Sequence, residues 1–273
     1  MSTKVWRRGN ESVRSKRQKI IYVNDESTSS DRRDARVQFK QKFDKLYNES
    51  QEKSYIDDWR SRFSSLNVEE LEKVEQELNS DTINYWMGIL TYIYYHTHGK
   101  TISKFANVDS GIPQLCKDKR KQMDNGSMTW GKYRKDICKF GYTSAAGEKK
   151  LLYNESDLLI PYNANNNHWY LVHVHTGVRD NEQYIKIYDS LQRVSNVEKY
   201  KKDMKDLEPI INDRIKIEIM NVPQQTDKFR CGLYMLHFAE CLIFGNNVNS
   251  IFNSILADYY KKVILHTIQK TDL

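Results

Sequence analysis

The feature that most constrains the fold of this 273-residue sequence is a change of hydrophobic period near its middle. Four short runs rich in Val, Ile, Leu and Tyr follow one another there, and such runs are typical of strands. They are residues 157–163, 168–175, 184–190 and 215–222. Helical patterns precede and follow this block, and the strands do not alternate with helices. The order therefore predicts an α+β fold in which a mixed or antiparallel sheet is flanked by helices.

Helical periodicity marks both ends of the chain. The segments that carry it are residues 33–64, 81–98, 231–245 and 250–270. The second of these segments is broadly apolar, so we expect a buried helix with Asp81 as its N-cap. Residues 68–79 are acidic and predict a surface helix or turn region. Residues 100–150 are basic and mixed, and several glycines interrupt them.

Most of the net positive charge lies at the N-terminus. Residues 1–24 hold seven basic residues and one acidic residue, which gives +6 of the formal net charge of +7. We expect residues 1–32 to be a basic and largely disordered tail. The cluster at residues 14–19 fits a nuclear localisation signal read by an import receptor, a contact with nucleic acid, or a tail that only aids solubility.

Cysteine content and hydropathy indicate a reducing compartment, the nucleus or the cytoplasm or both. Four cysteines in a chain of this length do not suggest a disulfide framework. They are Cys116, Cys138, Cys231 and Cys241. The N-terminus has no apolar signal segment, and the longest apolar run, residues 86–95, is too short to span a membrane. We therefore expect no membrane partner.

Four polar residues around the predicted strands form the parts of a thiol hydrolase. His168 begins one strand, Asp189 ends the next, and Cys231 opens a helix. The positive end of a helix dipole favours a thiolate, a nearby imidazole favours it further, and a carboxylate orients that imidazole. Gln225 lies in the loop before the helix, where its amide can stabilise an oxyanion beside the backbone N–H of Cys231. This chemistry needs no cofactor or metal.

Each of these residues alone also fits an ordinary structural role. A cysteine at a helix start is often a small buried residue, and Asp189 alone fits a turn or a cap. Cys116, Cys138 and Cys241 are expected in the core. His96 and His98 would form a metal site only if their segment were extended, and that segment reads as a helix end.

The order and spacing of these motifs carry a family resemblance. His-Trp heads one strand and Tyr-Asp-Ser ends the next. A Pro-Gln-Gln stretch follows, and Cys-Gly begins six residues after its second Gln. This pattern is similar to that of the ubiquitin-like-protein-specific proteases, the cysteine peptidases that process and deconjugate SUMO and related modifiers. Residues 78–87 and 158–163 also resemble family segments, so the resemblance spans roughly residues 70–245.

The resemblance implies a papain-like scaffold and a role for each residue. Cys231 would be the nucleophile, His168 the general base, Asp189 the orienting acid and Gln225 the oxyanion-hole residue. Trp169 would form one wall of a narrow tunnel that admits the C-terminal Gly-Gly of a modifier such as SUMO. A half-buried strand aromatic is the other interpretation of Trp169.

Two positions depart from the family pattern. Relatives usually have Asp before the nucleophile, where this chain has Arg230. A positive charge there would favour the thiolate but removes a carboxylate from the edge of the site. Relatives usually have Trp where this chain has Glu77, so the modifier-binding surface is expected to differ.

These observations predict three segments and leave several functions open. Residues 1–32 form the tail, 33–66 a helical extension and 67–273 a single catalytic domain. A thiol peptidase or isopeptidase acting on a ubiquitin-like modifier is the first hypothesis. The others are a viral-type or transposon-type maturation protease, a Cys-dependent acyltransferase, and a non-catalytic modifier-binding domain.

Overall fold

The structure is a computed structural model that describes most of the chain from residue 66 onward. The described residues are 66, 68–73, 75–99, 105–127, 129, 142–143, 149–150, 157–175, 184–191, 197–205, 207 and 216–271, with single positions at 37, 40, 41, 44, 45 and 48. The expected tail at 1–32 lies outside these residues. The single positions fall in the expected helix at 33–64 and are helical. One of them, Asp44, accepts hydrogen bonds from His266 and Lys270 near the C-terminus.

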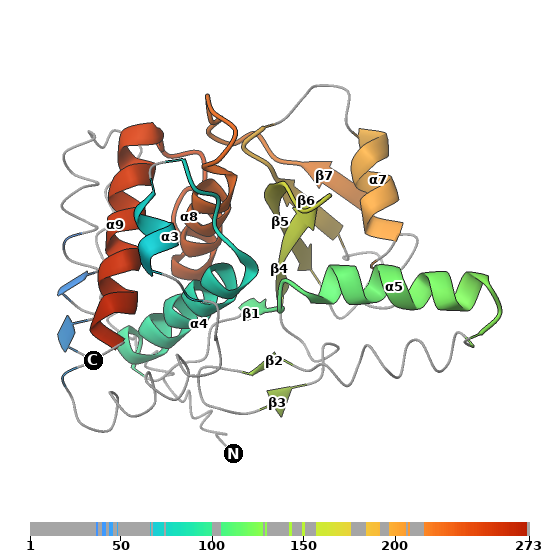
Figure 1. Ribbon diagram of the computed structural model, residues 1–273, viewed down its shortest axis with the longest axis horizontal. Coiled ribbons are helices and arrows are strands. Elements are labelled where there is room, and N and C mark those ends of the chain that lie inside the picture. The colour runs from blue at the N-terminus through green and yellow to red at the C-terminus, as the bar shows by residue number, and fades with distance from the viewer. Residues whose placement is uncertain are drawn as a thin grey trace, which may run out of the picture.

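A five-stranded mixed sheet forms the centre of the fold (Figure 1). Its order is β1 (Phe105–Asn107), β4 (Asp157–Ala164), β5 (His168–His175), β6 (Tyr184–Tyr188) and β7 (Lys216–Ile219). The three central strands pair antiparallel, and both edge strands pair parallel to their neighbours. A separate two-stranded sheet joins β2 (Tyr142–Thr143) and β3 (Lys149–Lys150). The predicted α+β class with a mixed sheet is confirmed.

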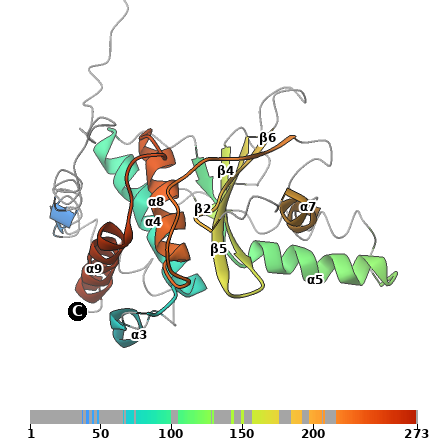
Figure 2. The same ribbon diagram turned by 90° about the horizontal axis from the view of Figure 1, so that it is seen from above.

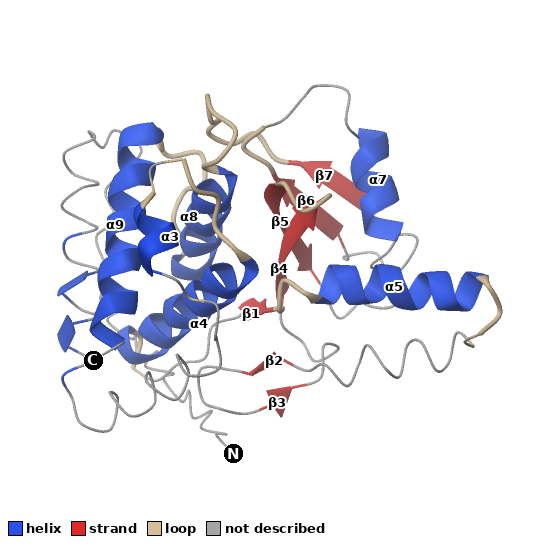
Figure 3. Cartoon of the chain, viewed as in Figure 1, coloured by secondary structure: helices blue, strands red, loops and turns tan. Residues whose placement is uncertain are grey.

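Helices cover both faces of the sheet (Figure 2). One layer contains α3 (Val68–Glu72), α4 (Ser80–Thr97), α8 (Cys231–Phe244) and α9 (Ser254–Thr271), and the other contains α5 (Ile112–Asp124) and α7 (Val197–Lys205). Figure 3 shows the sheet between these two sets of helices. Side chains of successive strand residues enter the two layers alternately, as the pleat of a strand requires. Leu159 and Leu171 pack with α8, whereas Leu158 and Val172 pack with α7.

Helix α8 is buried on nearly all of its surface, so its neighbours must approach closely. A Cβ atom on Gly232 would lie only 3.1 Å from Cβ of Leu78 and 3.4 Å from Cδ1 of Ile83. Glycine at this position therefore lets the start of α8 pack directly against the start of α4. The helix ends at Gly245, whose φ of 72° is the left-handed conformation that favours glycine.

The start of α4 differs from the sequence prediction. Its N-cap is Asn79, whose side chain accepts a hydrogen bond from the Thr82 backbone N–H at 2.8 Å. The predicted cap, Asp81, lies inside the first turn instead. The expected helix or turn region at 68–79 is helical only as far as Glu72. The carbonyl of Leu78 accepts from the indole N–H of Trp169, so the segment just before α4 is held against β5.

Five of the described elements were not expected from the sequence. Residues 100–150, for which no helix or strand was predicted, contain β1, α5, β2 and β3, and α7 lies between β6 and β7. Helix α7 lies in a parallel connection from β6 to β7, and α5 lies in another from β1 to β4, so β-α-β connections are present where none was predicted. No described helix is long and apolar enough to cross a membrane.

A buried hydrogen bond between α4 and α9 allows the packing of the helical layer to be tested. The indole N–H of Trp86 on α4 donates to the hydroxyl of Tyr260 on α9 at 2.6 Å, and both side chains are fully buried. Tyr260→Phe removes this acceptor and should lower the free energy of unfolding by about 1–3 kcal/mol, measured by urea denaturation. Tyr259→Phe changes the partly buried neighbour and serves as the control. A loss below about 0.5 kcal/mol for Tyr260→Phe would show that the contact does not stabilise the layer.

Candidate active site

The structure brings three of the predicted site residues together at one end of the inner strands β5 and β6. His168 is the first residue of β5, Asp189 follows the last residue of β6, and Cys231 is the first residue of α8. Because β5 and β6 are antiparallel, the start of one lies beside the end of the other. Helix α8 packs on β5, which brings Cys231 to the same place.

Asp189 is held by donors from three directions. Its carboxylate Oδ1 accepts from Nε2 of His168 and from the backbone N–H of Leu191, both at 2.8 Å. Its Oδ2 accepts from the hydroxyl of Tyr200 on α7. Burial leaves the Asp189 side chain only 2% exposed and by itself would raise the pKa of the carboxyl. The hydrogen bonds from His168, Tyr200 and Leu191 and the charge of His168 outweigh burial and lower that pKa, so Asp189 is ionised.

His168 is held between an acid and a thiol. Burial alone would lower the pKa of its imidazole, but the hydrogen bond and charge of Asp189, together with the nearby Cys231, raise that pKa to about 9. Nε2 is bonded to Asp189, and Nδ1 is buried without a hydrogen bond to any of the described residues. Nδ1 is therefore the atom left for proton exchange with the thiol. Since this pKa lies above neutral pH, the imidazole of His168 is protonated beside the Cys231 side chain at pH 7.

Gln225 lies in the loop before α8 and is held by the residue after Asp189. The hydroxyl of Ser190 donates to Oε1 of Gln225 at 2.5 Å, and the backbone N–H of Gln225 donates to the carbonyl of Ser190 at 2.9 Å. Nε2 of Gln225 donates one N–H to the carbonyl of Asp227. An amide has two N–H donors, so the second has no acceptor in the described part of the chain. This orientation suits a donor for a developing oxyanion.

The neighbouring Gln224 has a different role. Its side chain is exposed, and its Nε2 donates to the backbone carbonyls of Asp189 and Val222 at 3.1 and 2.9 Å. Both of its amide protons are thus engaged with backbone. The structure therefore favours Gln225 over Gln224 as the oxyanion donor.

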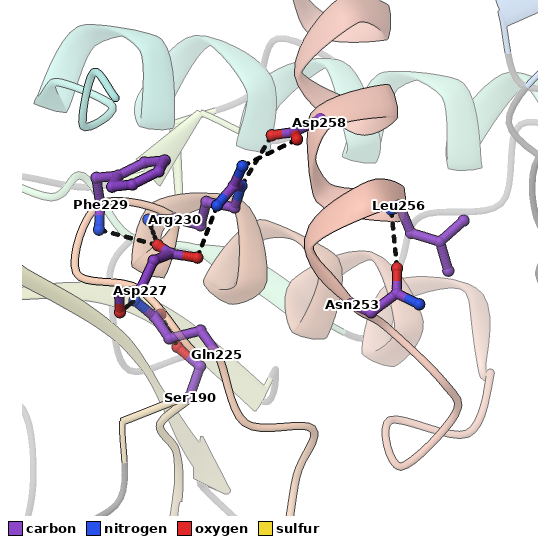
Figure 4. A network of polar contacts seen from close by, with 8 residues as sticks. All are labelled: Ser190, Gln225, Asp227, Phe229, Arg230, Asn253, Leu256 and Asp258. Atoms are coloured by element: carbon purple, nitrogen blue, oxygen red, sulfur yellow. Dashed lines mark hydrogen bonds and ion pairs between the residues drawn. The ribbon is translucent and has the colours of Figure 1, made fainter. Parts of the chain in front are cut away.

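Arg230, one departure from the family pattern, is compensated by two carboxylates (Figure 4). Its guanidinium donates to Oδ2 of Asp227 at 2.8 Å and forms a two-pronged contact with Asp258 of α9 at 2.8 and 2.9 Å. Asp227 also accepts the backbone N–H groups of Phe229 and Arg230, which shapes the turn into α8. Two negative charges offset the guanidinium, so Arg230 adds little net positive charge near the thiol. Its main effect is structural, because it connects the loop that contains Gln225 to α9.

Trp169 is fully integrated in the core of the helical layer. It is 2% exposed, and its indole N–H donates to the carbonyl of Leu78 at 2.9 Å. This contact joins β5 to the start of α4, next to Glu77. A role for Trp169 in binding a Gly-Gly tail stays a prediction.

Several residues that support the site were not predicted from the sequence. Ser190 was visible within the Tyr-Asp-Ser motif, but only its contact with Gln225 gives it a role. Asp227 lies four residues before Cys231, and an Asp at that position is a common turn residue. Tyr200 lies in a helix that was not expected, where the only signal is its spacing of four residues from the apolar Met204.

The remaining candidates are structural in the described part of the chain. Cys116 and Cys241 are buried, as expected, and form no disulfide with a described residue, and Cys138 lies outside the described residues. His96 is in the last turn of α4 and His98 is its C-cap, which confirms the expected helix end. The described residues include no group of three or more side chains that could hold a metal ion.

Solved structures of proteases resemble this fold at low sequence identity. A de-sumoylating protease is 13% identical with a TM-score of 0.50, over 76% of this chain and 85% of the other. The catalytic domain of Ulp1 in complex with Smt3, the yeast ortholog of SUMO, is 15% identical with a TM-score of 0.46, over 80% and 95%. The Xanthomonas campestris effector XopD bound to ubiquitin is 14% identical with a TM-score of 0.44, over 69% and 91%.

The family assignment comes from the sequence. A search among curated proteins found no match. The family model for the C-terminal catalytic domain of the Ulp1 protease family matches residues 103–267, and this range includes His168, Asp189, Gln225 and Cys231. Because the match covers more than half of the 273 residues, this chain belongs to the Ulp1 protease family and is a cysteine-type peptidase.

Proposed function

We propose that this protein is a thiol peptidase or isopeptidase that cleaves after the C-terminal Gly-Gly of a ubiquitin-like modifier, with a SUMO-type modifier as the first candidate. The observation that carries the proposal is the hydrogen bond between His168 and Asp189 with the Cys231 thiol beside the same imidazole. Family membership and the shared fold with a de-sumoylating protease support the choice of modifier.

In this proposal Cys231 is the nucleophile. Its thiolate attacks the carbonyl carbon of the last glycine, and the carbonyl oxygen becomes an oxyanion. The unengaged N–H of Gln225 and the backbone N–H of Cys231 at the positive end of α8 stabilise that charge. These donors are in place before the reaction, because Ser190 and Asp227 hold the Gln225 amide from both sides.

His168 carries the proton through both halves of the reaction. Its imidazolium protonates the leaving amine from Nδ1, the C–N bond breaks and a thioester with Cys231 remains. The neutral imidazole then takes a proton from water, which attacks the thioester and releases the modifier with a free carboxylate. Asp189 stabilises the imidazolium and keeps Nε2 protonated throughout, so that Nδ1 is the nitrogen that exchanges protons.

Labelling with modifier probes tests this assignment. SUMO, a Nedd-type modifier and ubiquitin, each carrying a C-terminal electrophile, are incubated with the full chain, and the adduct is measured by intact mass. We expect a covalent adduct at Cys231, formed fastest with the SUMO probe, and none with Cys231→Ser. Cys241→Ser, which changes a buried cysteine on the same helix, should label as the unmodified chain does.

The outcomes separate the competing functions. No adduct with any of the three probes, in a chain that circular dichroism shows to be folded, would contradict a modifier protease. Acetylation of Cys231 by acetyl-CoA in that case would favour an acyltransferase. An adduct formed only with ubiquitin would retain the chemistry and change the modifier.

Substitution of the two glutamines tests the oxyanion assignment. Gln225→Ala should lower kcat by about 10²–10³-fold with little change in KM, the typical effect of removing one oxyanion donor. Gln224→Ala removes contacts to backbone carbonyls only, so its effect should be much smaller. Steady-state kinetics on the modifier that labels fastest gives both values. If Gln224→Ala proved the more damaging change, the assignment of the oxyanion donor to Gln225 would be wrong.

A further inference from the structure

The catalytic acid is connected to a helix on the opposite face of the sheet from the nucleophile. Tyr200 lies on α7, is 1% exposed, and donates its hydroxyl to Oδ2 of Asp189 at 2.5 Å. Figure 2 shows α7 on one side of the sheet and α8, which begins at Cys231, on the other. Tyr200 therefore reaches the site from behind, where a substrate that approaches Cys231 does not touch it.

The two oxygens of Asp189 are not equally supplied with donors. Oδ1 accepts from both His168 and the Leu191 backbone N–H, whereas Tyr200 is the donor that the described residues provide to Oδ2. A buried carboxylate oxygen without a donor is costly, and the carboxylate would rotate to reduce that cost. Such a rotation would move Oδ1 away from the His168 ring.

Tyr200 is itself placed firmly by α7 and the sheet. Its ring packs edge-on against the ring of Tyr170 on β5, with centroids 5.4 Å apart. The hydroxyl of Tyr170 donates to Asp203, one turn further along α7, at 2.9 Å. Two tyrosine–carboxylate hydrogen bonds thus join α7 to the sheet. In the one at the candidate active site the tyrosine belongs to α7, and in the one beside it the tyrosine belongs to β5.

We propose that Tyr200 is a positioning residue of this active site, which fixes the orientation of the Asp189 carboxylate so that Oδ1 faces His168. The proposal rests on the proposed function, because it takes Asp189 as the orienting acid. It adds α7, an element absent from the expected catalytic parts, to the structure that catalysis requires. It also gives the hydroxyl of Tyr200 a role that Phe cannot supply.

The charge balance of the site gives this role a measurable consequence. The hydrogen bond and the charge of Asp189 raise the pKa of His168 as long as Oδ1 faces the ring. With Phe at position 200 the carboxylate turns and Oδ1 moves away from His168, so the imidazolium loses part of its hydrogen bond and the pKa of His168 should fall by about 0.5 or more. The other ionisable group that raises this pKa is Cys231, which stays unchanged in the experiment.

The test compares Tyr200→Phe with Tyr170→Phe. Each substitution removes one buried hydroxyl from one carboxylate and keeps the ring, so the two variants should lose similar thermal stability. We expect Tyr200→Phe to lower kcat by about 10-fold with KM within about twofold, because orientation of the acid is lost and substrate binding is not. We expect Tyr170→Phe to keep kcat within about twofold. NMR titration of His168 should show the downward shift of pKa only in Tyr200→Phe.

The titration also separates this proposal from the proposed function. It requires no substrate, so it reports on Tyr200 even if no modifier probe reacts with the chain. An unchanged His168 titration in a folded Tyr200→Phe variant would overturn the positioning role, whatever the activity. Equal losses of kcat in Tyr200→Phe and Tyr170→Phe would also overturn it, because general loosening of α7 would then explain both.

Discussion

The buried carboxylate of Asp189 is the interaction on which the rest of this site depends. An ionised carboxylate away from water is unfavourable unless donors compensate for the lost hydration. Here the donors come from β5, from α7 and from the turn after β6, so the charge is stable only when all three elements are in place. The same charge then holds the imidazolium of His168. Packing of the two layers and chemistry of the site are therefore linked through a single side chain.

The loop that follows β6 and the loop that precedes α8 form one unit. Ser190 and Gln225 exchange a backbone and a side-chain hydrogen bond, and Gln224 holds the carbonyl of Asp189. The acid and the candidate oxyanion donor thus keep a fixed relation to each other. Arg230 extends this unit to α9 through Asp227 and Asp258 (Figure 4). A substitution in α9 near Asp258 can consequently affect the start of α8 without contact with a substrate.

The sequence predicted those parts of the fold whose signal is local. The bounds of β5 were expected at 168–175 and observed there, because an eight-residue apolar run between polar turns has few alternatives. The start of α8 at Cys231 was also expected. The start of α4 was predicted two residues too late, because Asn79 rather than Asp81 accepts from one of the first free backbone N–H groups of the helix. Helix α7 is short and rich in lysine, so its buried pair of Tyr200 and Met204 gave too weak a period to identify it.

In the candidate site, too, the residues with a local sequence signal were predicted and those that act through distant contacts were missed. His168, Asp189 and Cys231 each stand at the end of a strand or helix, where a sequence pattern can place them. Ser190, Asp227 and Tyr200 act through contacts between segments that are distant in sequence, and no local pattern reveals such contacts. The compensation of Arg230 by Asp258 depends on the packing of α9 against α8, which the sequence does not indicate.

The central claim is that His168 and Asp189 act on Cys231 as one unit. The most direct measurement compares kcat/KM for His168→Ala, Asp189→Asn and the double variant on one modifier substrate. If Asp189 works only through the imidazole, the double variant should be as slow as His168→Ala alone, within about twofold. A double variant that is slower than His168→Ala by the full factor that Asp189→Asn causes on its own would show two independent contributions, and this would contradict the action of the two residues as one unit.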